Sequence, residues 1–160
     1  MGVSGSGKTT LGRRLAADQG WEFLDADDFH SAANKAKMAS GQPLTDADRD
    51  PWLEALAEAL RERVASGRGT ILACSALKES YRQRLGVDPA VRFVYLKADA
   101  ETIRRRLAGR RGHFFDARLL ASQFEALEEP EGALVVDVAG SPEDTVLAIE
   151  RGLGIVPGRE

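Results

Sequence analysis

The eight residues that follow Met1 constrain this chain more than any other part of it. Residues 2–9 read Gly-Val-Ser-Gly-Ser-Gly-Lys-Thr and match the pattern G-x-x-x-x-G-K-[ST] in full. Glycines let the backbone curl until successive N–H groups point at phosphate oxygens, and a helix that begins at the loop adds its positive dipole end. The lysine would neutralise the β- and γ-phosphates, and the threonine hydroxyl would hold Mg²⁺. The alternative is a flexible Gly/Ser-rich start.

The motif therefore predicts a nucleotide-binding loop that leads directly into a helix. The residues expected to contact the nucleotide are Gly2, Val3, Ser4, Gly5, Ser6, Gly7, Lys8, Thr9 and Thr10.

Short apolar runs alternate with helical patterns along the rest of the chain. Strands are predicted over 21–24, 70–74, 91–96 and 133–138, and helices over 8–19, 46–65, 78–86, 99–108, 116–127 and 142–152. Apolar runs without alternation indicate strands that are buried on both faces, as in a parallel sheet. The order predicts a three-layer α/β fold, with a parallel sheet flanked by helices. We expect one domain over 1–153 and a tail over 154–160.

The start of the helix over 46–65 is ambiguous. Thr45 and Asp48 fit a capping box, whereas Asp50 fits an N-cap with Pro51 at the first helical position. Both cannot hold at once.

A phosphate loop of this kind normally follows a buried central strand, yet only Met1 precedes Gly2. Loss of that strand would leave unpaired backbone groups on its two neighbours. The expectation is that the first strand is missing from this chain and that Met1 is an internal methionine of a longer natural protein.

Composition excludes several classes of protein. The chain has 160 residues with 22 Lys and Arg against 25 Asp and Glu, a formal charge of −3, which argues against a general nucleic-acid binder. No apolar run approaches the ~18–20 residues of a membrane span. The single cysteine, Cys74, cannot form an internal disulfide, so a cytoplasmic location is expected.

Two acids follow the strand predicted over 21–24. Asp25 and Asp27 lie where a parallel sheet presents its ligand-facing residues, and alternation along an extended chain would put them on the same side. One of them could reach the Mg²⁺ shell and the other could accept the proton of an attacking hydroxyl. The alternative is a solvated acidic turn.

An arginine-rich segment follows the third predicted strand. Five arginines fall between residues 104 and 111, and Arg106 and Arg110 are spaced i, i+4 on one helix face. Such a segment fits a lid, over about 104–118, that stabilises phosphate charge and excludes water. A solvated basic face is the alternative, and it fits Arg104 and Arg105.

These motifs together resemble the bacterial-type gluconokinases, which are P-loop kinases that phosphorylate D-gluconate at its 6-hydroxyl. The resemblance covers nearly the whole chain and is carried in order by GVSGSGKT (2–9), FLDADDFH (23–30), Asn34 with KMASGQPL (37–44), DADRDPWL (46–53), CSALKESYR (74–82), RLAGRRGHFF (106–115) and QFEALEEP (123–130).

On the nucleotide side, the resemblance implies ATP at the loop and Lys8, with Mg²⁺ at Thr9 and Asp25. Arg106 and Arg110 match the lid arginines of the family. Catalytic roles are thus expected for Lys8, Asp27, Arg106 and Arg110.

On the acceptor side, the resemblance assigns the hydroxyl contact and candidate base to Asp27 and the gluconate carboxylate to Arg49, whose guanidinium is a bidentate match. Arg49 could instead be a surface arginine and Lys78 a solvent-facing lysine. His30 and His113 could bind gluconate hydroxyls or simply pack loops. Trp52 and the pair Phe114 and Phe115 could wall the pocket or belong to the core.

The expected reaction is ATP-dependent phosphorylation of D-gluconate to 6-phospho-D-gluconate, in carbohydrate acid catabolism. The alternatives are a kinase for another small acid, resembling shikimate kinases, and a non-catalytic truncated nucleotide-binding protein. The resemblance is compatible with a homodimer, and no nucleic acid or membrane partner is expected. Ser31 stands where the family usually has a proline, and a change in loop stiffness is the expected effect.

Overall fold

Two pairs of parallel strands form the sheet of this protein, and the pairs are separated from each other. The computed structural model describes residues 1–108 and 117–156. Within this part, β1 (Glu22–Asp25) pairs with β2 (Thr70–Ala73), and β3 (Val94–Lys97) pairs with β4 (Leu134–Asp137). Leu24 lies opposite Leu72 in one pair and Leu96 lies opposite Val136 in the other. The parallel arrangement predicted from unalternated apolar runs is confirmed.

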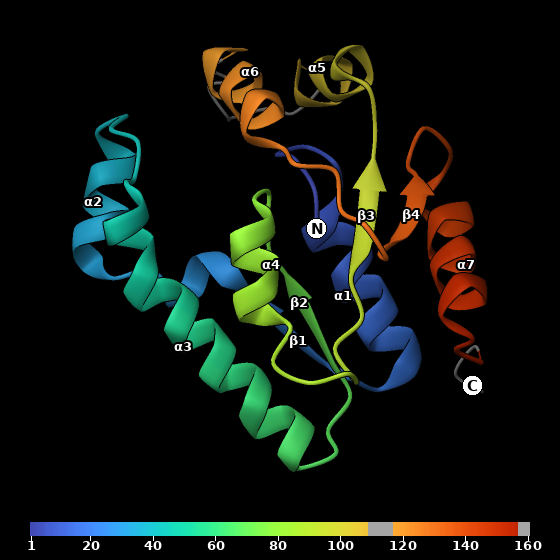
Figure 1. Ribbon diagram of the computed structural model, residues 1–160. Helices are drawn as coiled ribbons and strands as arrows, with labels where there is room; N and C mark the ends of the chain where they lie inside the picture. Colours follow the sequence, from blue (N-terminus) through green and yellow to red (C-terminus); the bar gives the residue numbers. More distant parts are fainter. Residues whose placement is uncertain (109–116, 157–160) are drawn as a thin grey trace.

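Helices cover both faces of the strands (Figure 1). The first helix and the last pack on one face, and two middle helices pack on the other: α1 (Lys8–Gln19) and α7 (Pro142–Leu153), then α3 (Asp46–Ala65) and α4 (Glu79–Leu85). Two more, α5 (Ala100–Ala108) and α6 (Ala117–Ala126), lie beyond the carboxyl ends of the strands, over the loop at residues 2–7 (Figure 1). This is the three-layer P-loop kinase fold that the sequence predicts.

Each helical layer has its own core. Leu53, Leu56 and Leu60 of α3 meet Leu85 of α4 over one face of the sheet. On the other face, the core contains residues of α1, β3, β4 and α7, namely Leu11, Leu15, Leu96, Val136, Val138, Val146 and Ile149. A strand between two such layers must carry apolar side chains on both faces. This explains why the strand sequences are continuously apolar and do not alternate with polar residues.

The ambiguous start of the long helix is decided by its cap. The Thr45 hydroxyl accepts a hydrogen bond from the Asp48 N–H, and the Asp48 carboxylate accepts one from the Thr45 N–H. This capping box satisfies two backbone donors reciprocally. The helix therefore begins at Asp46, and Pro51 lies inside it rather than at its first position.

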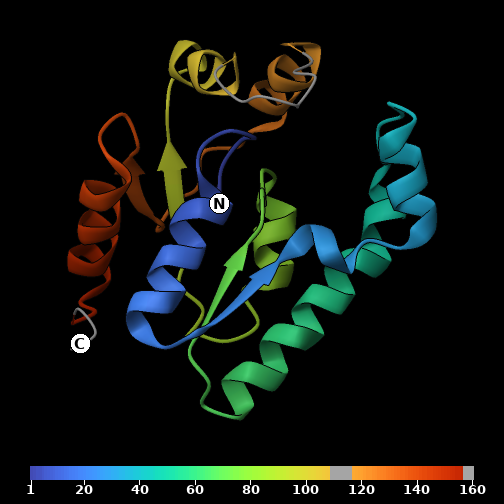
Figure 2. The same cartoon turned by 180° about the vertical axis from the view of Figure 1, so that it is seen from behind.

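Two elements between Asp25 and Gly41 were not predicted. A short 3₁₀ helix, η1 (Ala26–Phe29), follows β1, and α2 (Ala32–Ala39) stands at the upper end of α3 (Figure 2). The Ser31 hydroxyl accepts a hydrogen bond from the Asn34 N–H and caps α2. Ser31 therefore satisfies a helix N-terminus, which is a role beyond the change in loop stiffness that was expected for it.

The backbone of Met1 and Gly2 lies between the two strand pairs. The Met1 nitrogen donates to the Val94 carbonyl at 2.6 Å, and the Leu96 N–H donates to the Met1 carbonyl at 3.0 Å. On the other side, the Gly2 N–H donates to the Ser75 carbonyl, just after β2, at 3.2 Å. The sheet is thus divided into two strand pairs, with the backbone of Met1 and Gly2 between them. For the same reason β3 begins at Val94, three residues later than predicted, where β4 provides its partner.

Candidate active site

The loop at residues 2–7 has the geometry of an anion cradle. Gly5 and Gly7 adopt φ angles of +82° and +98°, which side chains rarely tolerate, and a Cβ on Gly5 would lie 3.0 Å from Leu107. Gly7 is the N-cap of α1, and no side chain caps this end of the helix. The first N–H groups of α1 therefore remain available to a ligand. A small polar hollow of about 80 Å³ lies there, lined by Gly5, Gly7, Lys8, Thr9 and Thr10. The arrangement suits a phosphate group.

Two side chains of the loop carry its polar chemistry. The Lys8 ammonium donates to the carbonyls of Gly2 and Val3, both at 3.0 Å, and is thereby held against the loop. The Ser6 hydroxyl is fully buried and has no hydrogen-bond partner among the residues that the structure describes. A cation and an unpaired buried hydroxyl within one Gly-rich turn are groups that an anion would engage.

Thr9 and Asp25 meet where α1 faces the end of β1. The Thr9 hydroxyl donates to one carboxylate oxygen of Asp25 at 3.3 Å, and the other oxygen accepts the Asp27 N–H at 3.2 Å. The two residues predicted to be metal ligands are therefore adjacent. Their oxygens are hard donors of the kind that Mg²⁺ prefers.

The predicted placement of Asp25 and Asp27 on one side of an extended chain is wrong. The strand ends at Asp25, whose carboxylate caps the 3₁₀ helix that holds Asp27. The cap turns the chain at this point, so strand alternation does not apply to Asp27. Its side chain is exposed at the same end of β1 as the phosphate loop.

His30 and Trp52 pack against each other behind Asp27. Their rings stack with centroids 4.5 Å apart and planes 9° apart, and the Trp52 indole N–H donates to the Ala26 carbonyl at 2.7 Å. Burial lowers the pKa of His30, opposed by the Asp27 carboxylate. Trp52 therefore belongs to the core. His30 packs in the loop, with its Nδ1 unpaired among the described residues.

Arg49 and Lys78, the two cations expected to bind the acceptor, converge on one carboxylate. The Lys78 ammonium and the Tyr81 hydroxyl donate to Asp46 at 3.0 and 2.6 Å, and the Arg49 guanidinium lies 3.7 Å from the same side chain. Hydrogen bonds from Tyr81 and then Lys78 lower the pKa of Asp46. Arg49 also donates to the Leu44 carbonyl at 2.7 Å. We refer to Asp46, Arg49, Lys78 and Tyr81 as the acceptor cluster.

Asp46 and Tyr81 had no role in the sequence-based site. Both lie within matching stretches, DADRDPWL and CSALKESYR, but 35 residues separate them and no spacing rule brings them together. Only the packing of α3 against α4 does so.

The turn that carries Lys78 is clamped by a buried arginine. Arg82 donates to the carbonyls of Ala76 and Leu77, both at 3.0 Å, although its side chain is only 5% exposed. Ala76 has a φ of +43°, in the left-handed region that costs a non-glycine residue free energy. Arg82 thus fixes a strained turn and, through it, the start of α4.

The side chain of Gln123 in α6 binds the phosphate loop, a contact that the sequence analysis did not predict. Its side-chain carbonyl accepts the Ser4 N–H at 2.6 Å, and its amide donates to the Ser4 hydroxyl at 3.0 Å. The residue lies in the matching stretch QFEALEEP, but a polar residue on a helix carries no local signal for a contact 119 positions away. The same loop packs at Gly5 against Ile103 and Leu107 of α5.

The lid is only partly within the described residues. Arg106 is half-buried in α5 and donates to the Val138 carbonyl, whereas Arg104 and Arg105 are exposed as expected. Arg110, His113, Phe114 and Phe115 lie outside the described residues. The predicted lid over about 104–118 therefore remains a prediction.

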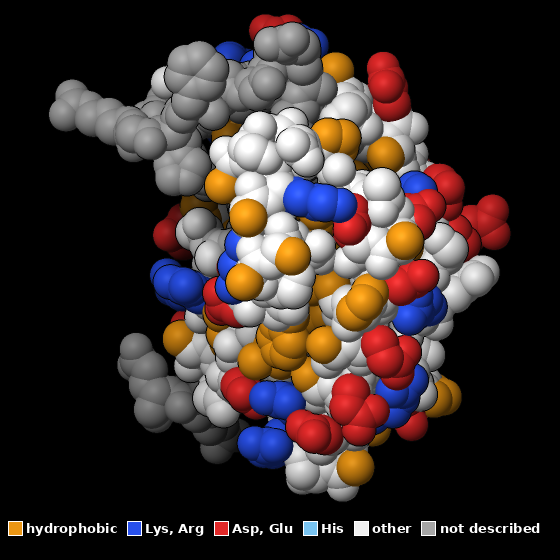
Figure 3. Space-filling view, turned by 90° about the vertical axis from the view of Figure 1, so that its left-hand side faces the viewer, with side chains coloured by type: hydrophobic (Ala, Val, Ile, Leu, Met, Phe, Trp, Pro, Cys, Tyr) orange, Lys and Arg blue, Asp and Glu red, His pale blue; other side chains and the backbone are white. Residues whose placement is uncertain are grey.

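Within residues 1–108 and 117–156, the remaining polar groups belong to the core or to surface ion pairs. Burial raises the pKa of the Cys74 thiol to about 11, in keeping with a core residue rather than a nucleophile. On the left-hand side of Figure 1, which carries α2 and α3, acidic and basic side chains are interspersed (Figure 3). Pairs such as Arg61 with Glu58 at 3.0 Å and Arg84 with Asp50 at 2.6 Å account for this pattern. None of the described helices is both long and apolar enough to span a bilayer.

Comparisons with known proteins show the family to which this chain belongs. Residues 1–130 match the AAA domain family. A gluconokinase from Gluconobacter oxydans (strain 621H) is 47% identical over 152 residues, which are 94% of this chain and 85% of that protein. The chain belongs to the gluconokinase family.

Solved structures of gluconokinase-like proteins have the same fold. The unliganded crystal structure of a sugar kinase from Janibacter sp. HTCC2649 matches with a TM-score of 0.89 and 46% identity, over 98% of this chain and 93% of that one. A gluconokinase from Sinorhizobium meliloti 1021 matches with a TM-score of 0.86 and 41% identity, over 96% and 89%. As a member of the gluconokinase family, the chain is a kinase that transfers phosphate to an alcohol group.

We predict that Gln123→Ala lowers kinase kcat/KM about tenfold. The change removes both bonds that hold Ser4, and two such bonds near the lower end of the usual range, about 0.7 kcal/mol each, together contribute roughly 1.4 kcal/mol, which corresponds to a factor of about ten. Steady-state kinetics measure the effect, with the exposed Glu125→Ala on the same helix as a control. A Gln123→Ala enzyme as active as the control would show that the grip on Ser4 has no role in turnover.

Proposed function

We propose that this protein transfers the γ-phosphoryl group of ATP to the 6-hydroxyl of D-gluconate. The observation that carries the proposal is the arrangement at one edge of the sheet, where the phosphate loop with Lys8 and Thr9 faces Asp25 and Asp27. Membership of the gluconokinase family supports gluconate as the acceptor. The acceptor cluster also contains two cations, Arg49 and Lys78, whose charge suits the carboxylate of a sugar acid.

Thr9 and Asp25 would hold Mg²⁺, which their adjacent hydroxyl and carboxylate oxygens fit. When bound there, the cation would neutralise charge on the β- and γ-phosphate oxygens.

The chain's own residues supply positioning and charge. Phosphoryl transfer passes through a loose, in-line transition state in most analyses, so catalysis rests on orientation and electrostatic stabilisation. Lys8 would bind the phosphates and Arg106 would approach the transferring group from α5. Asp27 would orient the acceptor hydroxyl and accept its proton late in the reaction.

Arg49 would bind the gluconate carboxylate through its guanidinium fork. The Asp46 carboxylate lies between the Lys78 ammonium and the Arg49 guanidinium and screens their charges from each other, so the acceptor cluster carries one net positive charge. His30, stacked on Trp52, would form the wall behind Asp27, and His113 stays a proposed contact to the acceptor.

ADP release from MgATP, measured with and without D-gluconate, tests the proposal. Gluconate-dependent release is the expected result. Release that depends instead on another small acid, such as shikimate, would favour the rival kinase. ATP binding without release for any acceptor would favour a non-catalytic nucleotide-binding protein.

We predict that Asp27→Asn lowers kcat at least tenfold and leaves ATP affinity nearly unchanged. The amide keeps the shape of the side chain but cannot accept the hydroxyl proton. General-base catalysis typically contributes 10²–10⁴-fold to the rate, and the contribution is at the low end when the transition state is loose, because little proton transfer has then occurred. Initial rates and nucleotide titrations separate the two effects, and Lys8→Ala should impair both. Normal turnover of Asp27→Asn would remove this carboxylate from the mechanism.

A third prediction concerns Arg49. Arg49→Lys should raise the KM for gluconate about tenfold with an unchanged KM for ATP, because a lysine keeps the charge but loses the bidentate match. The control is Arg61→Lys on the exposed face of the same helix, where the arginine contacts only Glu54 and Glu58 among the described residues. Equal KM values for the two variants would place the carboxylate elsewhere.

A further inference from the structure

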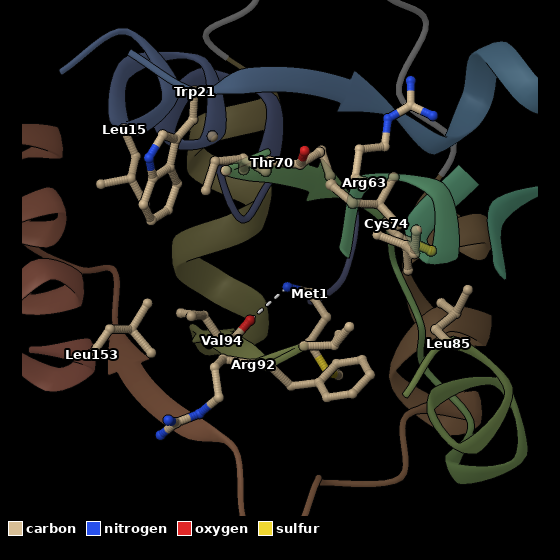
Figure 4. Close-up of a pocket in the computed structure, with 18 of the residues that line it drawn as sticks. Met1, Leu15, Trp21, Arg63, Thr70, Cys74, Leu85, Arg92, Val94 and Leu153 are labelled. Carbon is tan, nitrogen blue, oxygen red and sulfur yellow. Dashed lines mark hydrogen bonds between the residues drawn. The ribbon is translucent and has the colours of Figure 1, made fainter. Parts of the chain in front are cut away.

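Helix α4, which follows Lys78 of the acceptor cluster, is fixed at its two ends in different ways. At the C-terminal end, Leu85 is buried in one core with Leu53, against which Met1 also packs (Figure 4). At the N-terminal end, Lys78 is the N-cap residue, but a lysine side chain has no acceptor atom and caps nothing. The first N–H groups of a helix have no partner within the helix, so this end needs an acceptor from another segment.

Glu128, just after α6, provides this acceptor. Its carboxylate accepts the N–H of Glu79, the first residue of α4, at 2.5 Å, and its own N–H donates to the Leu77 carbonyl at 2.9 Å. A carboxylate at this position is also favoured by the positive end of the helix dipole. One residue therefore holds the main chain on both sides of Lys78.

An apolar cluster lies beside the same turn and reaches the phosphate loop. Val3 of the loop, Ile103 of α5 and Leu120 of α6 are buried together, and Leu77 and Leu127 pack against them. The turn before Lys78 and the loop that would hold the nucleotide thus share one small core. The polar bonds of Glu128 lie at the edge of this core.

Residues 123–128, which we call the strap, connect the two halves of the candidate site. At one end Gln123 holds Ser4 of the phosphate loop, with bonds of 2.6 and 3.0 Å. At the other end Glu128 holds the turn that carries Lys78. The position of the Lys78 main chain relative to the phosphate loop is therefore set through this short stretch.

We propose that Glu128 is a positioning residue for the acceptor, which it serves by fixing Lys78 within the acceptor cluster. This inference rests on the proposed function, in which Lys78 belongs to the acceptor site. The Lys78 ammonium lies on a long stem, beside Asp46 at 3.0 Å and 5.5 Å from the centre of the Tyr81 ring. Fixing the main chain reduces the space that this stem can explore. In-line transfer requires such a defined acceptor position.

Kinetics of three variants test the role of Glu128. Glu128→Ala should raise the KM for gluconate about three- to fivefold and leave the KM for ATP unchanged, because loss of one cap loosens the turn at Lys78. Glu128→Gln keeps an oxygen that can accept the same bond, and it should restore most of the loss. Glu129→Ala is the matched control, since this neighbouring carboxylate is exposed and forms an ion pair with Lys97 at 2.7 Å. It should behave as the wild type.

A double-mutant cycle with Lys78 tests whether Glu128 acts through that residue. In a Lys78→Ala background, Glu128→Ala should cause no further rise in the KM for gluconate, because the group that it positions is gone. An equal rise in both backgrounds would show that Glu128 acts elsewhere, and it would overturn the proposal.

Two other results would also overturn it. One is a KM for gluconate that is the same in Glu128→Ala and Glu129→Ala. The other is a lower kcat with both KM values unchanged and no rescue by Glu128→Gln, which would leave Glu128 a purely structural role. Failure of the proposed function gives a different result, because the wild type would then show no gluconate-dependent ADP release. If another small acid is the acceptor, the same variants are measured with that acid, and a wild type that phosphorylates no acceptor would overturn both proposals.

Discussion

The main chain of Met1 and Gly2 is the link on which the rest of this structure depends. Hydrogen bonds to Val94 and Leu96 on one side and to Ser75 on the other connect two strand pairs that otherwise do not pair. The phosphate loop starts at this link, so its position relative to Asp25 at the end of β1 depends on these few bonds. The glycines that follow allow the tight backbone conformation of the loop, whereas the hydrogen bonds of Met1 and Gly2 fix the position of the loop relative to the strands.

Around the loop, several of the candidate site residues are held in place by hydrogen bonds from neighbouring side chains. Asp25 caps the 3₁₀ helix that carries Asp27, and Gln123 grips Ser4 from α6. Arg82 clamps the strained turn at Ala76 ahead of Lys78, and Asp46 holds Lys78 and Tyr81 together. Such supporting contacts fix the geometry of a site whose chemistry needs orientation more than covalent assistance.

Sequence reasoning was most successful where the signal is local or periodic. The phosphate loop, the four strands and six of the helices were predicted, with ends that differ by up to three residues. It missed α2, whose eight residues carry a weak apolar pattern behind an unremarked Ser31 cap, and it placed Asp27 on an extended chain where a cap turns the backbone. Gln123, Asp46 and Tyr81 were also missed, because their partners lie 32 to 119 residues away.

The sequence by itself determined the anion-binding loop, the parallel α/β architecture and the family, since glycine spacing, unalternated apolar runs and ordered motifs are properties of the chain. Only the tertiary structure decided how Thr9 meets Asp25, which carboxylate gathers Arg49 and Lys78, and what shape the gap in the sheet has. These depend on how α3 packs on α4 and on the register of Met1 against β3, and contacts between distant segments arise only when the layers pack together.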